Sequence, residues 1–380
     1  MNVPKLRFKE FNDEWTKEYA GNLCSIQTGK SNTQDKVDDG IYPFYVRSKI
    51  VEKSHKYIFD TEAVLTVGDG VGVGKVFHYI NGKFDCHQRV YMMNNFKNIT
   101  AKYFYYIFSR DFDKRVMKMT AKTSVDSVRY EMIDKMEIYY PTIKEQLKVA
   151  NFLSLLDKKI ELQSKKIEDL KLFKKGLINV LNKKSYQETA LGKIGKFQTS
   201  SIDKLVKGNE KIVNLYNYMD VYKHKILMTQ DLKKLSKTSA KDNQITINNL
   251  KRGDILFTPS SETPDDIGHS ICIQEDLPNT VYSYHLLRYR PNIIMDPLFS
   301  NYYFNNSKIR KQIIRYATGA TRYTISLDSF LKIKVDIPDL ITQKKYGLLL
   351  YSTDKKVNKE LFKLNKLQEL KKGLIQDMFV

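Results

Sequence analysis

Polar side chains that could read nucleic-acid bases stand beside arginine at two matching places in the chain. The first group is Lys122, Thr123, Ser124 and Arg129, and the second is Gly319, Ala320, Thr321, Arg322 and Tyr323. Hydroxyl and guanidinium groups make the hydrogen bonds that base edges and phosphates offer in and around the major groove. A loop that merely begins a strand could carry the same residues, so both interpretations stay open.

Three further segments have a similar composition and form a second set of candidates. They are Arg47, Ser48 and Lys49 after a predicted strand, Arg89 after His87-Gln88, and Ser260, Ser261 and Glu262 after Pro259. Arginine pairs with guanine, and a glutamate can accept a hydrogen bond from the amino group of cytosine. These loops are therefore predicted to contribute to a binding surface, and ordinary loop residues are the alternative.

No sequence motif indicates a catalytic or metal centre. Residues 68–75 are rich in glycine, but they lack the spacing of a P-loop and of a dinucleotide fingerprint, so a turn or bulge is expected. Pro264-Asp265 has no acidic-x-Lys partner of the kind that nucleases use. The six histidines form no HExxH or Cys/His cluster. We expect a chain that is not an enzyme and binds no metal.

The charge balance favours a polyanionic partner. The chain carries 64 Lys and Arg against 43 Asp and Glu, a formal net charge of +21, and 12% of its residues are aromatic. Such an excess attracts nucleic acid or an anionic membrane, and no basic amphipathic helix near either end supports the membrane. Three scattered cysteines indicate buried thiols in a reducing compartment. With no apolar run long enough to span a membrane, a cytoplasmic location is expected.

An internal repeat organises the chain. The 38 residues from Pro141 align without a gap with those from Pro338, at an offset of 197 residues. Matching positions include Gln146 and Gln343, an Asp-Lys-Lys triplet at 157–159 and 354–356, and a shared Lys-Lys-Gly-Leu-Ile ending. The same offset continues upstream through the two polar groups described first. The chain is therefore predicted to contain two related halves with unlike middles.

Both repeated segments read as long helices whose apolar residues recur at heptad-like spacing. The apolar stripes are Leu153, Leu156, Ile160, Ile167, Leu170 and Leu177 in the first segment, and Leu350, Val357, Leu364, Leu367 and Leu374 in the second. Two narrow stripes would bury each other as an antiparallel coiled coil, each helix about 60 Å long at about 1.5 Å per residue. The matched Gly176 and Gly373 are expected to mark a close backbone approach.

The segments between the helices read as globular, mixed α/β domains. Strands are predicted at 41–46, 63–67, 71–79 and 90–93 in the first half, and at 212–215, 255–258, 269–273 and 281–289 in the second. Helices are predicted at 101–119 and 298–316. The expected class is α+β, with one recognition domain at 1–141, a spacer helix at 142–184, a second domain at 185–338 and a second helix at 339–380.

This layout resembles the specificity subunit of type I restriction–modification systems. The resemblance lies in the strand–Pro–x₄–Gln openings that end at Gln146 and Gln343, the Asp-Lys-Lys helix middles and the Lys-Lys-Gly-Leu-Ile ends. It implies that each variable domain reads one half of a split DNA target and that the helices set the spacing. It also implies two partner modification subunits that bind S-adenosylmethionine, and restriction or motor subunits that use ATP and Mg²⁺. This chain itself would bind no cofactor.

Three other functions fit parts of the sequence. A stand-alone DNA-binding regulator would bind specifically without partners. A coiled-coil scaffold would carry its basic charge incidentally, and its binding would depend little on salt. A nuclease of unrecognised type would nick DNA in a metal-dependent reaction.

Overall fold

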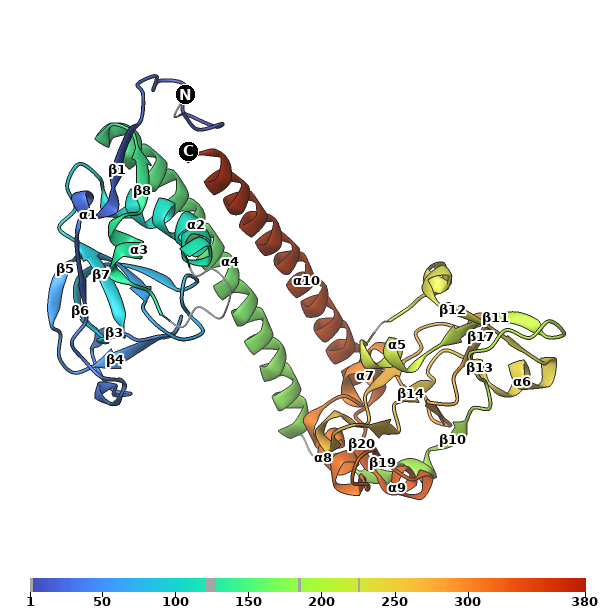
Figure 1. The fold of residues 1–380 in the computed structure, drawn as a ribbon. Coiled ribbons are helices and arrows are strands. Elements are labelled where there is room, and N and C mark those ends of the chain that lie inside the picture. Colours follow the sequence, from blue (N-terminus) through green and yellow to red (C-terminus); the bar gives the residue numbers. More distant parts are fainter. Residues whose placement is uncertain (1–2, 120–126, 184–185, 225) are drawn as a thin grey trace. The chain divides into compact units, whose positions relative to one another are not determined.

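The chain forms two compact units, each built around one globular domain. The computed structural model describes residues 3–119, 127–183, 186–224 and 226–380. The first unit comprises residues Met1–Lys165 and Phe362–Val380, and the second comprises Lys166–Leu361. Because both boundaries between the units fall inside long helices, each unit contains a segment of both helices (Figure 1).

The two long helices are α4 (Ile143–Lys183) and α10 (Leu340–Asp377). In the first unit, Leu153 of α4 shares a core with Leu374 and Met378 at the end of the chain. In the second, Lys166 Nζ lies 3.1 Å from Glu360 Oε1, and Lys174 Nζ lies 2.6 Å from Asp354 Oδ1. In each unit the helix segments therefore run antiparallel. All eleven residues of the predicted apolar stripes are buried or half-buried.

The first domain is a six-stranded sheet in the order β2-β7-β5-β6-β3-β4, with a separate antiparallel pair β1-β8. Helix α2 lies against β5 and β6, and its apolar side buries Tyr103, Phe104, Ile107, Phe108 and Val116 (Figure 1). The bounds are β1 Thr16–Tyr19, α1 Ala20–Leu23, β2 Ser25–Thr28, η1 Thr33–Asp35, β3 Tyr42–Tyr45, β4 Val51–Ser54, β5 Phe59–Val67, β6 Phe77–Cys86, β7 Val90–Asn94, α2 Ala101–Met119, α3 Tyr130–Asp134 and β8 Glu137–Tyr140.

The second domain contains two four-stranded sheets, β10-β18-β14-β16 and β12-β11-β17-β13, and two short pairs, β15-β19 and β20-β9. The bounds are β9 Glu188–Ala190, η2 Leu191–Lys193, β10 Gly195–Thr199, β11 Lys211–Tyr216, α5 Tyr218–Tyr222, η3 Thr229–Lys234, β12 Ser236–Ala240, α6 Asp242–Ile247, β13 Asn249–Leu250, β14 Ile255–Phe257, β15 Ser260–Ser261, η4 Pro264–Asp266, β16 Ser270–Cys272, β17 Leu277–Tyr282, β18 Leu287–Pro291, α7 Pro297–Tyr303, α8 Ser307–Tyr316, β19 Tyr323–Thr324, α9 Leu327–Lys332 and β20 Lys334–Asp336.

The repeat seen in the sequence recurs in the way each domain is joined to the helix that follows it. An antiparallel strand pair precedes the helix in both units: β1-β8, with Thr16 opposite Tyr140, and β9-β20, with Ala190 opposite Lys334. This confirms the predicted architecture of two mixed domains, two long helices and an internal repeat. No helix in the described part of the chain is both long and apolar enough to cross a membrane.

Four predictions of local structure were wrong. Residues 71–75 form the turn after β5 and not the start of a strand, because Gly70 and Gly74 have positive φ. The predicted strand 281–289 is two strands, broken by a turn in which Leu286 N donates to Ser283 O. The predicted helix 298–316 is two helices, because the Asn306 side chain caps α8 by accepting from Ile309 N. Gly176 and Gly373 mark no close approach, since a Cβ on either would meet nothing within 4 Å.

Candidate nucleic-acid interface

The predicted contact loops meet at an equivalent place in both domains. In the first unit, Val128 N donates to Gly68 O at 2.7 Å, and in the second, Ile325 N donates to Pro259 O at 3.0 Å. Val128 and Ile325 are separated by the 197-residue offset of the repeat. Next to these bonds, Asp69 forms a β-bridge with Ser127, and Ser260 pairs with Thr324. The same backbone junction therefore presents different side chains in the two domains.

In the first domain the junction brings Arg47 and Arg89 together around Asp69. Asp69 Oδ1 lies 3.2 Å from Arg47 Nη1, and Asp69 Oδ2 lies 3.8 Å from Arg89 Nε. Both arginine side chains remain about half-exposed, at 47% and 65%. Gly70 next to Asp69 has a φ of 76°, which favours glycine and turns the chain sharply. Composition identified the arginines in the sequence, but nothing there pointed to Asp69.

The other candidate DNA-contact residues of the first domain that the structure describes form no hydrogen bond or ion pair with the cluster of Arg47, Asp69 and Arg89. Ser48 closes a tight turn after β3 through a hydrogen bond from its hydroxyl to Ile50 O at 3.0 Å, and Lys49 beside it is exposed. Arg129 is exposed at the N-terminal end of α3. Lys122, Thr123 and Ser124 lie outside the described residues.

A buried polar network holds the arginine side of this junction in place. His87 is almost fully buried, and its Nδ1 accepts from Arg89 N at 2.9 Å. Burial lowers the pKa of His87, and the nearby positive charge of Arg47 lowers it further. Buried Asp85 accepts from Ser31 Oγ at 2.7 Å and from Ser54 Oγ at 3.3 Å. These contacts fix the loops whose outer residues face solvent.

In the second domain the junction opens into a surface hollow. It is lined by Tyr218, Met219, Tyr222, Ser260, Ser261, Glu262, Asp266, Thr321 and Arg322. Five of these residues were candidates from the sequence: Ser260, Ser261, Glu262, Thr321 and Arg322. Arg322 Nη2 donates to Ser260 Oγ at 3.3 Å, which joins the two loops. Tyr323 lies in β19, directly opposite Ser261.

Gly319 gives the second loop its shape. Its φ is 136°, and a Cβ there would lie 2.1 Å from Arg322 O. A side chain at this position would therefore push apart the turn that presents Thr321 and Arg322.

Two tyrosines that sequence reasoning missed support this hollow. Tyr218 OH donates to Ser260 O at 2.9 Å, and Tyr222 OH donates to Asp266 Oδ2 at 2.9 Å. Their rings stack with centroids 6.1 Å apart. Burial raises the pKa of Tyr218, and the hydrogen bond to Asp266 raises that of Tyr222, so both hydroxyls stay protonated donors at neutral pH. The tyrosine-rich stretch 216–222 was the signal in the sequence that could have indicated them.

A second duplicated feature lies where each domain meets the N-terminal half of its helix. In the first unit Tyr106 OH donates to Asp157 Oδ2 at 2.7 Å, and Lys371 pairs with the same carboxylate. In the second unit Lys174 pairs with Asp354, and its ammonium lies 5.0 Å from the ring centroid of Tyr302. The lysine in each case comes from the other repeat.

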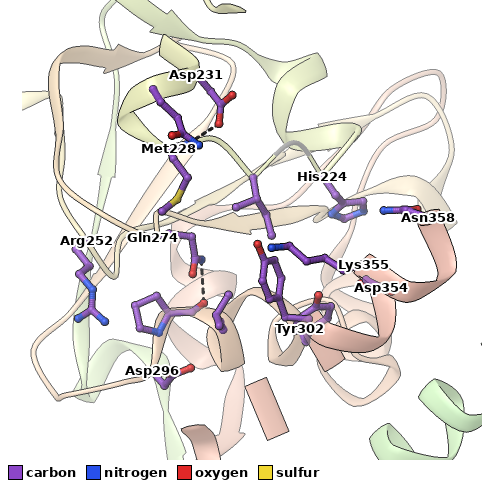
Figure 2. A pocket seen from close by; sticks show the side chains of 15 residues that line it. His224, Met228, Asp231, Arg252, Gln274, Asp296, Tyr302, Asp354, Lys355 and Asn358 are labelled. Carbon is purple, nitrogen blue, oxygen red and sulfur yellow. Dashed lines mark hydrogen bonds between the residues drawn. The ribbon is translucent and has the colours of Figure 1, made fainter. Parts of the chain in front are cut away.

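Each of these clusters borders a surface hollow. Tyr106, Asp157 and Lys158 line the hollow in the first unit, together with Ser154 and Glu161. In the second unit the four helix positions 197 residues further along, Tyr351, Asp354, Lys355 and Asn358, line a hollow of about 800 Å³ together with Tyr302. Figure 2 shows Tyr302 of α7 beside Asp354 and Lys355 of α10. Each unit thus presents an equivalent surface beside its helix.

The described residues include no group of three or more His, Cys, Asp or Glu side chains placed to hold a metal ion. All three cysteines are free and buried, and burial raises the pKa of the Cys24 thiol to about 12.

Comparisons with known proteins agree with this geometry. Residues 12–172 match the family described as type I restriction modification DNA specificity domain. The type I restriction enzyme EcoDI specificity subunit of Escherichia coli is 26% identical over 157 residues, which are 41% of this chain and 34% of that protein. The MjaVIII specificity subunit of Methanocaldococcus jannaschii is 26% identical over 200 residues, covering 48% of this chain and 46% of that protein. The chain therefore spans less than half the length of the curated relatives it matches.

The fold extends the match to the whole chain. The crystal structure of a type I restriction–modification S subunit from M. genitalium superposes with a TM-score of 0.65 at 17% identity, covering 100% of this chain and 99% of that one. A structure from work on complex assembly of the type I system gives a TM-score of 0.52 at 11% identity, covering 98% and 99% of the two chains. The resemblance predicted from the sequence is confirmed: residues 12–172 match the model of the type I restriction modification DNA specificity domain, and the chain as a whole has the fold of the S subunits.

Proposed function

We propose that this chain is a sequence-specific DNA-binding specificity subunit, in which each domain reads one half of a bipartite site. The observation that carries the proposal is the duplicated junction. The backbone hydrogen bond from Val128 N to Gly68 O recurs as the one from Ile325 N to Pro259 O, while the side chains around it differ. Two unlike domains on a repeated frame can read two unrelated half-sites, whereas two identical domains would require a palindrome. The net charge of +21 supports binding to the phosphate backbone.

We also propose that two copies of a modification subunit dock on the repeated surfaces. The Tyr–Asp–Lys clusters and the hollows beside them present similar groups in both units. A partner that recognises one of these surfaces would recognise the other. In this proposal S-adenosylmethionine is bound by those partners, ATP and Mg²⁺ by restriction or motor subunits, and this chain catalyses no step. The complex would act on DNA in the cytoplasm.

Methylome sequencing tests the proposal directly. A methylation-free host would express this chain together with its neighbouring modification subunit, and a second culture would express that subunit alone. We expect a new split motif of methylated adenines only when this chain is present. No new motif, with both proteins soluble and co-purifying, would contradict the proposal.

The remaining alternatives make different predictions for the purified chain. A stand-alone regulator would bind one site tightly and specifically without any partner. A coiled-coil scaffold would show little change in DNA binding between 50 and 200 mM salt, whereas phosphate contacts give a steep dependence.

A further inference from the structure

The second domain carries a two-stranded ribbon whose tip presents one carboxylate and one guanidinium. The ribbon is formed by β15 and β19, with Ser260 opposite Thr324 and Ser261 opposite Tyr323. Beyond the ribbon both chain segments bend, and Glu262 and Arg322 lie in these bends. Ser260, Glu262 and Arg322 nevertheless line the same surface hollow. The 3.3 Å contact from Arg322 Nη2 to Ser260 Oγ agrees with this arrangement.

Neither the Glu262 carboxylate nor the Arg322 guanidinium forms an ion pair with a described residue of the domain. Glu262 is exposed and has no hydrogen bond or ion pair with any described residue. Arg322 is exposed, and its contact with Ser260 occupies only one of its five N–H donors. By contrast, the neighbouring Asp266 is held by Tyr222 OH and by His269 Nε2, each at 2.9 Å. Asp266 therefore belongs to the support of the hollow, while Glu262 and Arg322 are free to bind.

An unpaired carboxylate on a surface that faces DNA weakens binding unless it accepts a hydrogen bond from a base. The phosphate backbone repels it, so Glu262 weakens any binding that depends on charge alone. In the major groove, which admits a two-stranded ribbon, only amino groups of bases donate to a carboxylate. A G·C pair presents guanine O6 and N7 as acceptors and cytosine N4 as a donor, which complements an arginine beside a glutamate.

We propose that Arg322 and Glu262 together read one G·C base pair in the half-site of the second domain. Arg322 would bind guanine, and Glu262 would accept from the amino group of the paired cytosine. This inference rests on the function proposed above. Tyr218 is a positioning residue, because its hydroxyl holds the Ser260 carbonyl at 2.9 Å and so fixes the ribbon.

The test is a set of methylomes from cells that express the modification subunit with wild-type chain, Glu262→Gln, Arg322→Lys or Glu168→Gln. Glu168 is an exposed helical residue of the same unit and serves as the matched control for loss of one negative charge. We expect a G·C pair in one half of the wild-type motif. Preference for that pair should fall about ten-fold in Glu262→Gln and in Arg322→Lys, as for loss of one good base contact. The other half-site should be unchanged, which also shows that the variants fold.

The outcomes separate this inference from the proposed function. A wild-type motif with no G·C pair in the affected half, a change at an A·T pair, or an unchanged motif in both variants would overturn the inference and leave the function standing. Equal loss in both half-sites would also overturn it, because it would indicate a general effect on binding. If the wild-type chain directs no motif, the inference falls together with the proposed function.

Discussion

Two buried glutamines fasten the helices to the domains by the same hydrogen bonds. Gln146 Oε1 accepts from Thr100 N at 2.8 Å, and Gln343 Oε1 accepts from Asp296 N at 2.8 Å. Their amide groups donate to Pro141 O and Pro338 O, at 2.9 and 2.8 Å. Each glutamine therefore links the start of a long helix to the start of the domain helix packed beside it.

Replacing either glutamine with alanine should destabilise its unit. Gln146→Ala and Gln343→Ala each leave a backbone N–H and a carbonyl without a partner in a buried site, which costs about 1–3 kcal/mol. Urea unfolding of the purified chain measures this loss. Gln376→Ala, at an exposed position of α10, is the matched control and should have little effect. Equal stability of all three variants would show that water replaces the lost bonds.

The two glutamines also show how far single residues could be predicted. Their matched positions in the repeat marked both as important in the sequence, but the partners Thr100 and Asp296 come from segments that share no motif. The same holds for Asp69, Tyr218 and Tyr222 at the candidate interface. Their importance comes from tertiary contacts, which neither composition nor spacing encodes.

At the scale of elements, two glycines inside the long helices can be replaced with a gain in stability. A Cβ at Gly176 or Gly373 would meet nothing within 4 Å, so alanine fits without displacement. Glycine in a helix interior costs about 1 kcal/mol relative to alanine. Gly176→Ala and Gly373→Ala should each raise the free energy of unfolding by up to about 1 kcal/mol, as measured by urea titration.

Gly319→Ala is the informative contrast to these helix variants. Because its φ is positive and a Cβ would collide with Arg322 O, this change should destabilise the chain and distort the ribbon tip. Loss of stability in the helix variants as well would contradict the open surroundings of Gly176 and Gly373.

Elements with strong periodicity could be predicted, and those ended by side-chain caps could not. Helix α2 was predicted with its observed bounds, because an unbroken apolar stripe runs along it. The helix pair α7 and α8 looks equally periodic in sequence, but Asp296 and Asn306 each cap a separate helix start. Similarly, the apolar residues around Ser283 hide the turn between β17 and β18. At both places local hydrogen bonds, and not the apolar periodicity, determine where the helix or strand ends.

At the scale of the whole molecule, several histidines should make stability depend on pH in one direction. Burial lowers the pKa of His78, His87, His224 and His285. The unfolded chain therefore binds more protons than the folded chain once the pH falls through the ordinary histidine range near 6.5. The stability present above that range should be lost progressively as the pH is lowered further.

Thermal unfolding between pH 7.5 and pH 5 measures this effect. The melting temperature should fall on acidification, and His78→Gln should reduce the slope, because the His78 ring is half-buried beside Tyr45 with centroids 5.0 Å apart and its pKa is lowered. A melting temperature that stays constant or rises on acidification would contradict the lowered pKa of these imidazoles.

Exchange of one domain tests whether the two halves read DNA independently. Replacing residues 30–135 with the corresponding segment of another family member should change only one half of the methylated motif, because the junction around Gly319 and Arg322 lies entirely in the other unit. The retained pair β1-β8 and helix α4 keep the attachment of the new domain. A methylome in which both halves change would refute modular reading.

The exchanged segment must still fit the retained helix. Tyr106 contacts Asp157, Tyr103 OH donates to Tyr139 O at 3.2 Å, and Arg110 donates to the carbonyl of Val380, all within the first unit. A chimera that lacks these three side chains should fold less stably and methylate weakly at both halves. Restoring them in the same chimera should recover methylation while the new half-site is kept. Recovery with a return to the original motif would instead mean that these anchoring residues take part in reading DNA.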